Sequence, residues 1–141
     1  MTLHIRIRPN SGLPLYRQIA NEVKAAWLRG YVRPGERLPS VRELAAELGL
    51  NPTTVVKAYD QLDRERIVVR RQGQGAFVAG GDEPLLPEER DARIGELAQE
   101  LALEGRRLGF SEKDITDLVR RKLLELRPEE GGAANDKRST P

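Results

Sequence analysis

The stretch that decides the fold runs from Leu38 to Val78 and reads LPSVRELAAELGLNPTTVVKAYDQLDRERIVVRRQGQGAFV. Two short segments with helical apolar spacing come first, separated by Gly49, and a glycine-rich segment follows them. Ser40 with Glu43 three residues later is a capping-box pattern, which predicts that a helix begins directly after Ser40. Gly49 stands where a left-handed residue commonly ends a helix. The inward residues of this helix are expected to be Val41, Leu44, Ala45 and Leu48.

The second helix of this stretch is predicted to begin at once. Asn51 is a good N-cap, and Pro52 suits the first helical position because its missing N–H has no partner there. Apolar residues at positions i, i+3, i+4 and i+7 give a buried stripe of Val55, Ala58, Tyr59 and Leu62. The opposite face, which is free to meet a groove, carries Pro52, Thr53, Val56, Lys57 and Asp60.

A β-hairpin is predicted after these helices. Residues 67–70 and 76–79 read as strands on either side of RQGQG, so the tip is basic and glycine-rich. Two short helices joined by a tight turn and followed by such a hairpin form a winged helix-turn-helix, whose second helix enters a DNA groove. The fold class is therefore mainly α, an α+β winged domain with a small helical hairpin behind it.

The N-terminal part should complete the winged domain. Leu3, Ile5 and Ile7 alternate with polar residues, which predicts a short strand or an extended arm. Apolar residues then recur at helical spacing from residue 15 to about residue 29, and Gly30 ends that helix. Trp27 lies within this pattern and is expected in the core.

The chain after Gly80 is predicted to form a separate region. Residues 80–89 are glycine-rich, then acidic and proline-containing, and are expected to be a linker. A helix should follow to about Leu108, and Ser111 with Asp114 should cap another. Two helices alone bury too little surface, so we expect an antiparallel hairpin that pairs with a second copy. The domains are thus 1–80, 81–127 and a polar, disordered tail of 128–141.

Composition narrows the function classes. Residues 1–80 hold 13 basic against 7 acidic residues, a formal charge of +6, whereas residues 81–141 hold 11 against 15, or −4. The positive charge of residues 1–80 favours binding to a polyanion. The chain has no cysteine, its single histidine is His4, and Gly73-x-Gly75 lacks the Lys-Ser/Thr of a phosphate loop. We therefore expect no enzyme, metal or cofactor, and the absence of a long apolar run predicts a soluble cytoplasmic protein.

On these motifs the sequence resembles the GntR family of bacterial transcription regulators. The resemblance rests on PLYRQIANEV, RPGERLPSVRELAAELGLNPTTVVKAYDQLDRERIV and RRQGQGAFV, and it spans roughly residues 13–127. Asn51-Pro52, KAYDQL and the short C-terminal region are similar to the YtrA-like subfamily. Arg66 departs from the family pattern, in which a glycine commonly follows the glutamate, and this puts the local turn in question.

The resemblance implies a set of DNA-binding residues on the helices and the wing. They are Arg42, Asn51, Pro52, Thr53, Thr54 and Lys57 at the major groove, with Arg70, Arg71, Gln72, Gly73 and Gly75 over the minor groove. Arginine can grip guanine, and helix N-terminal amides suit phosphate. Structural readings stay open beside these: Asn51 as a cap only, the threonines as first-turn residues, and Arg70 or Arg71 as edge-strand charges.

The implied function is a homodimeric, sequence-specific regulator, a repressor that binds a palindromic operator. The apolar residues expected to form the dimer are Ile94, Leu97, Leu101, Ile115, Leu118, Val119 and Leu123. The alternative is a winged-helix module for protein interaction or non-specific DNA architecture, since a fold does not fix a function. A small-molecule effector is left open, because two helices can enclose a pocket only with a partner's help.

Overall fold

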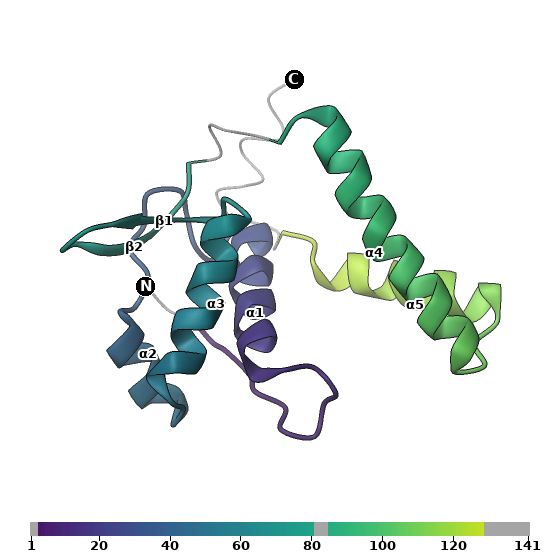
Figure 1. The fold of residues 1–141 in the computed structure, drawn as a ribbon, viewed down its shortest axis with the longest axis horizontal. Helices are drawn as coiled ribbons and strands as arrows, with labels where there is room; N and C mark the ends of the chain where they lie inside the picture. The colour runs from purple at the N-terminus through teal and green to yellow at the C-terminus, as the bar shows by residue number, and fades with distance from the viewer. Residues whose placement is uncertain (1–2, 81–84, 129–141) are drawn as a thin grey trace. The chain divides into compact units, whose positions relative to one another are not determined.

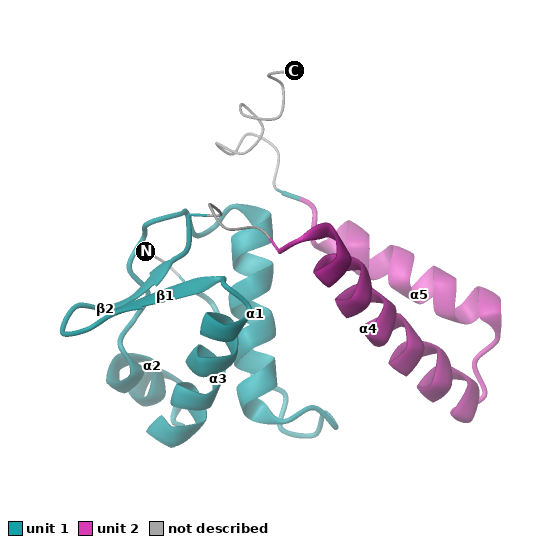
Figure 2. Cartoon of the chain, turned by 45° about the horizontal axis from the view of Figure 1, so that its top comes forward, with its two compact units in different colours: residues 1–83, 128–141 teal, residues 84–127 magenta. Residues whose placement is uncertain are grey.

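The computed structural model describes residues 3–80 and 85–128. In chain order these residues form three helices, a β-hairpin and two further helices (Figure 1). They fall into two compact units, which Figure 2 draws in teal and magenta. The mainly helical α+β winged fold expected from the sequence is confirmed.

The first unit contains α1 (Leu15–Arg29), α2 (Val41–Leu48) and α3 (Pro52–Arg64), followed by β1 (Val68–Arg71) and β2 (Gly75–Val78). The predicted starts of all three helices, and the predicted ends of α1 and α2, match these bounds. Each strand lies one residue closer to the hairpin tip than predicted, because Arg71 and Gly75 still pair across the sheet.

Local caps begin the two helices of the helix-turn-helix. Ser40 Oγ accepts from the Glu43 N–H at 3.0 Å, and Glu43 Oε1 accepts from the Ser40 N–H at 2.8 Å, so the predicted capping box is present. Asn51 Oδ1 accepts from the Thr53 N–H at 2.8 Å, and Pro52 is the first residue of α3. Short-range sequence patterns therefore set where both helices start.

The ends of these helices share one geometry. Gly30 after α1 and Gly49 after α2 have φ values of 85° and 68°, the left-handed region that glycine adopts readily. After α3 the same position is Arg66, with φ of 63°. The Ile67 N–H donates to Leu62 O at 2.9 Å, the bond that closes this kind of helix end. The turn before the wing is thus formed by an arginine in a glycine-type conformation.

The core of the first unit lies between α1, α2, α3 and the inner face of the hairpin. Its buried apolar side chains are Leu3, Ile19, Ala20, Val23, Ala26, Val32, Leu38, Leu44, Ala45, Val55, Ala58, Tyr59, Leu62, Val68, Ala76 and Val78. The stripe predicted for α3 is confirmed, and on α2 Leu44 and Ala45 are buried while Val41 and Leu48 are half-buried.

The prediction that Trp27 lies in the core is wrong. Its exposed fraction is 37%, and its neighbours Leu28 and Tyr31 are exposed as well. The inward face of α1 is set by Ile19, Val23 and Ala26, so Trp27, one residue further along, is turned about 100° away from that face.

An extended N-terminal arm packs beside α1. Residues 3–8 are in no strand, but Leu3 is buried and Ile5 and Ile7 pack against the core. The buried side chain of Gln18 holds the arm: its Oε1 accepts from the Arg8 N–H at 2.7 Å, and its Nε2 donates to Arg8 O at 3.0 Å. The arm reading of the alternating pattern is therefore correct.

The second unit contains α4 (Pro87–Arg107) and α5 (Glu112–Glu125). The expectation that the linker extends to Glu89 is wrong, because Pro87 takes the first helical position and Glu89 Oε1 accepts from the Leu86 N–H at 2.9 Å. The predicted Ser111–Asp114 capping box is present. Residues 81–84 of the predicted linker and 129–141 of the predicted tail lie outside the described residues.

Candidate nucleic-acid interface

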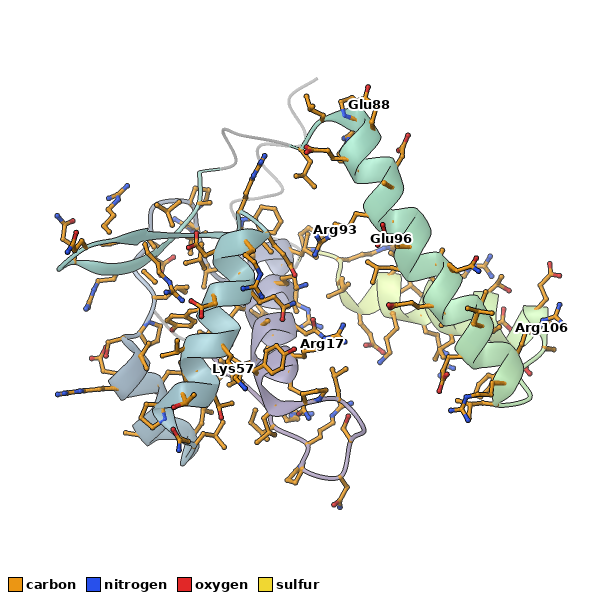
Figure 3. The ribbon with its side chains drawn as sticks, viewed as in Figure 1. Arg17, Lys57, Glu88, Arg93, Glu96 and Arg106 are labelled. Atoms are coloured by element: carbon orange, nitrogen blue, oxygen red, sulfur yellow. The ribbon has the colours of Figure 1, made fainter. Side chains whose placement is uncertain are left out.

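The N-terminal half of α3 presents a polar, open face. Asn51, Pro52, Thr53 and Lys57 are exposed, and Thr54 is half-buried. Figure 3 labels Lys57 on α3. Oδ1 of Asn51 accepts the cap bond, and its amide Nδ2 has no partner in the described part of the chain and can meet another molecule. The prediction that Asn51 caps α3 is therefore confirmed, and the two N–H donors of its amide are left for another molecule.

Arg42 lies in the first turn of α2 and is exposed. The capping box places it: the backbone N–H of Ser40 binds the Glu43 carboxylate and lowers the pKa of that carboxyl, and the Ser40 hydroxyl adds to the effect. The α2 start is also fixed to α3, because the Tyr59 hydroxyl donates to Pro39 O at 2.6 Å. Burial raises the pKa of Tyr59, which keeps this hydroxyl a donor.

The strands of the wing divide its basic residues between two faces. Side chains alternate along a strand, so Val68 and Arg70 share one face of β1 while Val69 and Arg71 share the other. Val68 is buried against the core, which turns Arg70 towards α3. There its Nη2 pairs with Asp60 Oδ1 at 2.6 Å. Arg70 thus links the wing to α3, and its charge is partly neutralised by Asp60.

The other face of the wing is the outer face. It carries Val69, Arg71, Gly75 and Phe77, since Val69 pairs with Phe77 and Arg71 with Gly75. The guanidinium of Arg71 lies 4.8 Å from the centre of the Phe77 ring, a cation–π contact. Arg71 is therefore supported by an aromatic ring and free of any ion pair among the described residues.

The tip of the hairpin is formed by Gln72, Gly73 and Gln74, all exposed. The Gln74 N–H donates to Arg71 O at 2.9 Å, and the turn requires φ of 77° at Gly73. Gly75 follows with φ of 111°. Both predicted glycines are thus needed for the backbone of the tip itself, quite apart from any approach to DNA.

Two residues near this surface were missed from the sequence. Arg37 lies beside the wing tip, where its Nε donates to Gln74 O at 3.2 Å. Asp60 was placed on the outward face of α3 without a partner, and it is the anion that holds Arg70. Residue 37 lies 37 positions before Gln74, so no local spacing signals the contact.

The second unit exposes the apolar residues predicted for dimerisation. The exposed fractions are 66% for Ile94, 47% for Leu97, 40% for Leu101, 37% for Val119 and 63% for Leu123, while Ile115 and Leu118 are half-buried. In α4 the only buried residue is Gly105, and α5 has none. The described part of this unit therefore has no core of its own.

One groove is lined by residues of this unit. Its walls are formed by Phe110, Asp114, Asp117, Leu118, Arg120, Arg121 and Leu124. The lining includes Leu118 of the predicted dimer surface.

No helix among residues 3–80 and 85–128 is long and apolar enough to cross a membrane.

The chain is similar to known bacterial regulators. The family model for bacterial regulatory proteins of the gntR family matches residues 15–78. The HTH-type transcriptional repressor YtrA of Bacillus subtilis (strain 168) is 33% identical over 132 residues, which cover 94% of this chain and 99% of YtrA.

Two solved structures are similar in fold. A transcriptional antiterminator from Listeria monocytogenes EGD-e has a TM-score of 0.77 and 30% identity, with 91% of this chain and 98% of that chain covered. The AraR DNA-binding domain in complex with operator ORX1 has a TM-score of 0.50 and 27% identity, over 56% of this chain and 99% of that chain. Because the match to YtrA extends over nearly the whole of both chains, this protein belongs to the gntR family of bacterial regulatory proteins.

Proposed function

We propose that this protein is a sequence-specific DNA-binding transcriptional regulator, a repressor that acts as a homodimer on a palindromic operator in the cytoplasm. The observation that carries the proposal is that Asn51, Thr53 and Lys57 at the start of α3 are exposed, as is Arg42 in the first turn of α2. The buried apolar residues of both helices, among them Leu44, Val55 and Leu62, face the core instead. The relation to a repressor and to a domain seen with operator DNA supports the same reading.

The dimensions of α3 suit a major groove. Its 13 residues make a rod of about 20 Å, and a major groove about 12 Å wide accepts one α-helix. The hydroxyl of the exposed Thr53 at its start can meet a phosphate, while Lys57, one turn further on, can reach base edges or backbone. Arg42 lies on the neighbouring helix α2 and is expected to contact the operator directly. We therefore expect the first turns of α2 and α3 to recognise the base sequence of the operator.

A second copy of the chain is proposed to cover the exposed apolar residues of α4 and α5. An exposed stripe that includes Ile94, Leu97 and Leu101 on one helix and Leu123 on the other is larger than isolated surface residues account for. Such helices gain stability by packing against the same helices of a partner. The resulting two-fold symmetry predicts an operator with two inverted half-sites about one helical turn apart.

The first test is selection of bound fragments from randomised duplex DNA. We expect one palindromic sequence, bound about a thousandfold more tightly than a scrambled duplex at near-physiological salt. Equal affinity for every duplex would instead indicate an architectural DNA binder. An absence of binding at low salt would contradict the DNA-binding proposal and favour a protein-interaction module.

The selected duplex then tests the helix-turn-helix directly. Arg42→Ala should weaken operator binding by about 1–3 kcal/mol while leaving the thermal unfolding midpoint unchanged. Glu47→Ala on the same helix is the matched control, because Glu47 is also exposed but carries the wrong charge for a phosphate. If Arg42→Ala binds as tightly as the wild type, Arg42 does not contact the operator.

A further inference from the structure

Arg37 occupies a distinct place in the first unit, on the outer face of the wing. Residues 36–38 run along β2 as a third extended segment: the Leu38 N–H donates to Ala76 O and the Val78 N–H to Glu36 O, both at 2.8 Å. Arg37 is thereby set opposite Phe77 in an antiparallel bridge. Residues directly opposite in such a pairing share a face, so Arg37 lies on the same face as Phe77 and Arg71.

The position of the Arg37 side chain is defined by two further contacts. Its Nε donates to Gln74 O at the wing tip, at 3.2 Å. A Cβ atom at Gly75 would stand 3.3 Å from the same Nε and 3.6 Å from Nη2, so the guanidinium lies across the bare Cα of that glycine. The absence of a side chain at Gly75 is therefore what lets Arg37 reach the tip.

The remaining donors of Arg37 are available to a ligand. Its side chain is exposed, and among the described residues it forms no ion pair. The Glu43 carboxylate, on which Arg37 acts electrostatically, is already bonded to the Ser40 N–H at 2.8 Å. With Nε held by the wing, the two terminal nitrogens form a fixed fork, a geometry that matches the oxygens of a phosphate.

We propose that Arg37 is a DNA-backbone ligand that joins the wing to the helix-turn-helix: it holds the tip through Gln74 O and binds one phosphodiester of the operator through its terminal nitrogens. This inference rests on the proposed function. A phosphate is favoured over a base because Arg37 lies at the side of the tip, over Gly75, while Gln72 and Gly73 form its end. Phosphate contacts of this kind fix the register of a protein on DNA.

The salt dependence of binding separates a phosphate contact from a merely structural brace. Each neutralised phosphate adds about 0.9 to the magnitude of the slope of log affinity against log salt concentration. Arg37→Gln should bind the selected operator about tenfold more weakly and reduce this magnitude by about 0.9. Arg37→Lys keeps the charge but loses the fork, so it should retain the slope with an intermediate affinity.

Arg64→Gln is the matched control, because Arg64 is an exposed arginine of the same unit at the far end of α3 from Pro52. It should leave affinity and slope unchanged. Phosphate ethylation interference adds an independent readout: one phosphate in each half-site should be sensitive with the wild type and insensitive with Arg37→Gln.

Two outcomes would overturn the inference while the proposed function stands. One is an Arg37→Gln protein that binds like Arg64→Gln, and the other is weaker binding with an unchanged slope and an unchanged ethylation pattern. The thermal unfolding midpoint of each variant shows whether it has a folding defect. If Arg37→Gln has one, the ethylation pattern with Arg37→Lys decides whether residue 37 contacts a phosphate. If the wild type itself shows no preferred operator, the proposed function fails first, and the inference fails with it.

Discussion

At the scale of single residues, Arg66 holds an uncommon backbone conformation. It is the only non-glycine residue with positive φ in the described part of the chain. A side chain in the left-handed region costs about 1–2 kcal/mol, because its Cβ approaches the following carbonyl oxygen. The hydrogen bonds of this helix end, Ile67 N–H to Leu62 O and Arg66 N–H to Asp63 O, depend on that conformation. The chain therefore keeps the turn at a cost in stability.

Replacing Arg66 with glycine should stabilise the first unit. Arg66→Gly removes the strain but gives the unfolded chain more freedom, so the expected gain in the free energy of unfolding is about 0.5–1 kcal/mol. Urea unfolding followed by the fluorescence of Trp27, the only tryptophan, measures it. Arg66→Ala is the control, since it removes the same charge but keeps a Cβ. An equal gain in both variants would show that charge, not strain, is responsible.

Glu43 makes the first unit sensitive to acid. The Ser40 N–H, and then the Ser40 hydroxyl, lower the pKa of the Glu43 carboxyl from an ordinary value of 4.5. A carboxyl with a lowered folded-state pKa stabilises the fold above its ordinary pKa, and this stabilisation is lost as pH falls through the folded-state value. Between pH 6 and pH 3 the urea midpoint should therefore fall further for the wild type than for Glu43→Gln.

The matched control for this pH dependence is Glu47→Gln, which removes a carboxyl from the same helix outside the capping box. Its urea midpoint should follow that of the wild type. A Glu43→Gln protein that loses as much stability on acidification as the wild type would contradict the argument.

At the scale of elements, local patterns predicted most of the fold. Caps at Ser40, Asn51 and Ser111 lie within three residues of the groups they bind, so the helix starts could be predicted from short windows. The start of α4 was missed although Pro87 carries a recognised first-turn signal. Trp27 was misplaced because periodicity alone does not set the width of the buried face.

The wing could be predicted as a hairpin but not as part of a surface. Arg70 and Arg71 are adjacent in the sequence and were assigned one role, whereas alternation turns Arg70 towards Asp60 and Arg71 towards Phe77. The hydrogen bond from Arg37 to Gln74 O joins residues 37 positions apart, so it could be found only from the folded structure. The types of residue at the candidate site could therefore be predicted from the sequence. Which of them hold the wing in place and which are left to bind a ligand could not.

The ion pair between Arg70 and Asp60 should couple the wing to α3. Both side chains are about 40% exposed, at 39% and 42%, so solvent weakens the pair. A double-mutant cycle of Arg70→Gln and Asp60→Asn in urea should give a coupling free energy of about 0.2–1 kcal/mol. The same cycle with Arg71 in place of Arg70 is the control and should give no coupling. A coupling of zero for Arg70 would mean that the wing is held in place by its apolar face alone.

At the scale of the whole molecule, charge and apolar surface are divided between the two units. Residues 1–80 carry a formal charge of +6, which suits a DNA-facing part, and residues 81–141 carry −4. The buried core lies in the first unit, while the second exposes most of its leucines. In the proposed dimer the second unit therefore sets how many DNA-binding units meet one operator, and the first sets which sequence they meet.

Breaking the proposed dimer should weaken operator binding without any change at the proposed DNA-binding residues. Leu118→Glu with Leu123→Glu places two charges on the proposed interface, and sedimentation should then find a monomer. Because two linked units bind a palindrome more tightly than one, the monomer should lose about a hundredfold or more of the affinity for the full operator, and much less for an isolated half-site. Leu103→Glu is the control: Leu103 is 62% exposed, as Leu123 is at 63%, but points away from the stripe of Leu97 and Leu101. A double variant that still sediments as a dimer would move the interface elsewhere, whereas a monomer that keeps full operator affinity would show that a single winged domain is sufficient for recognition.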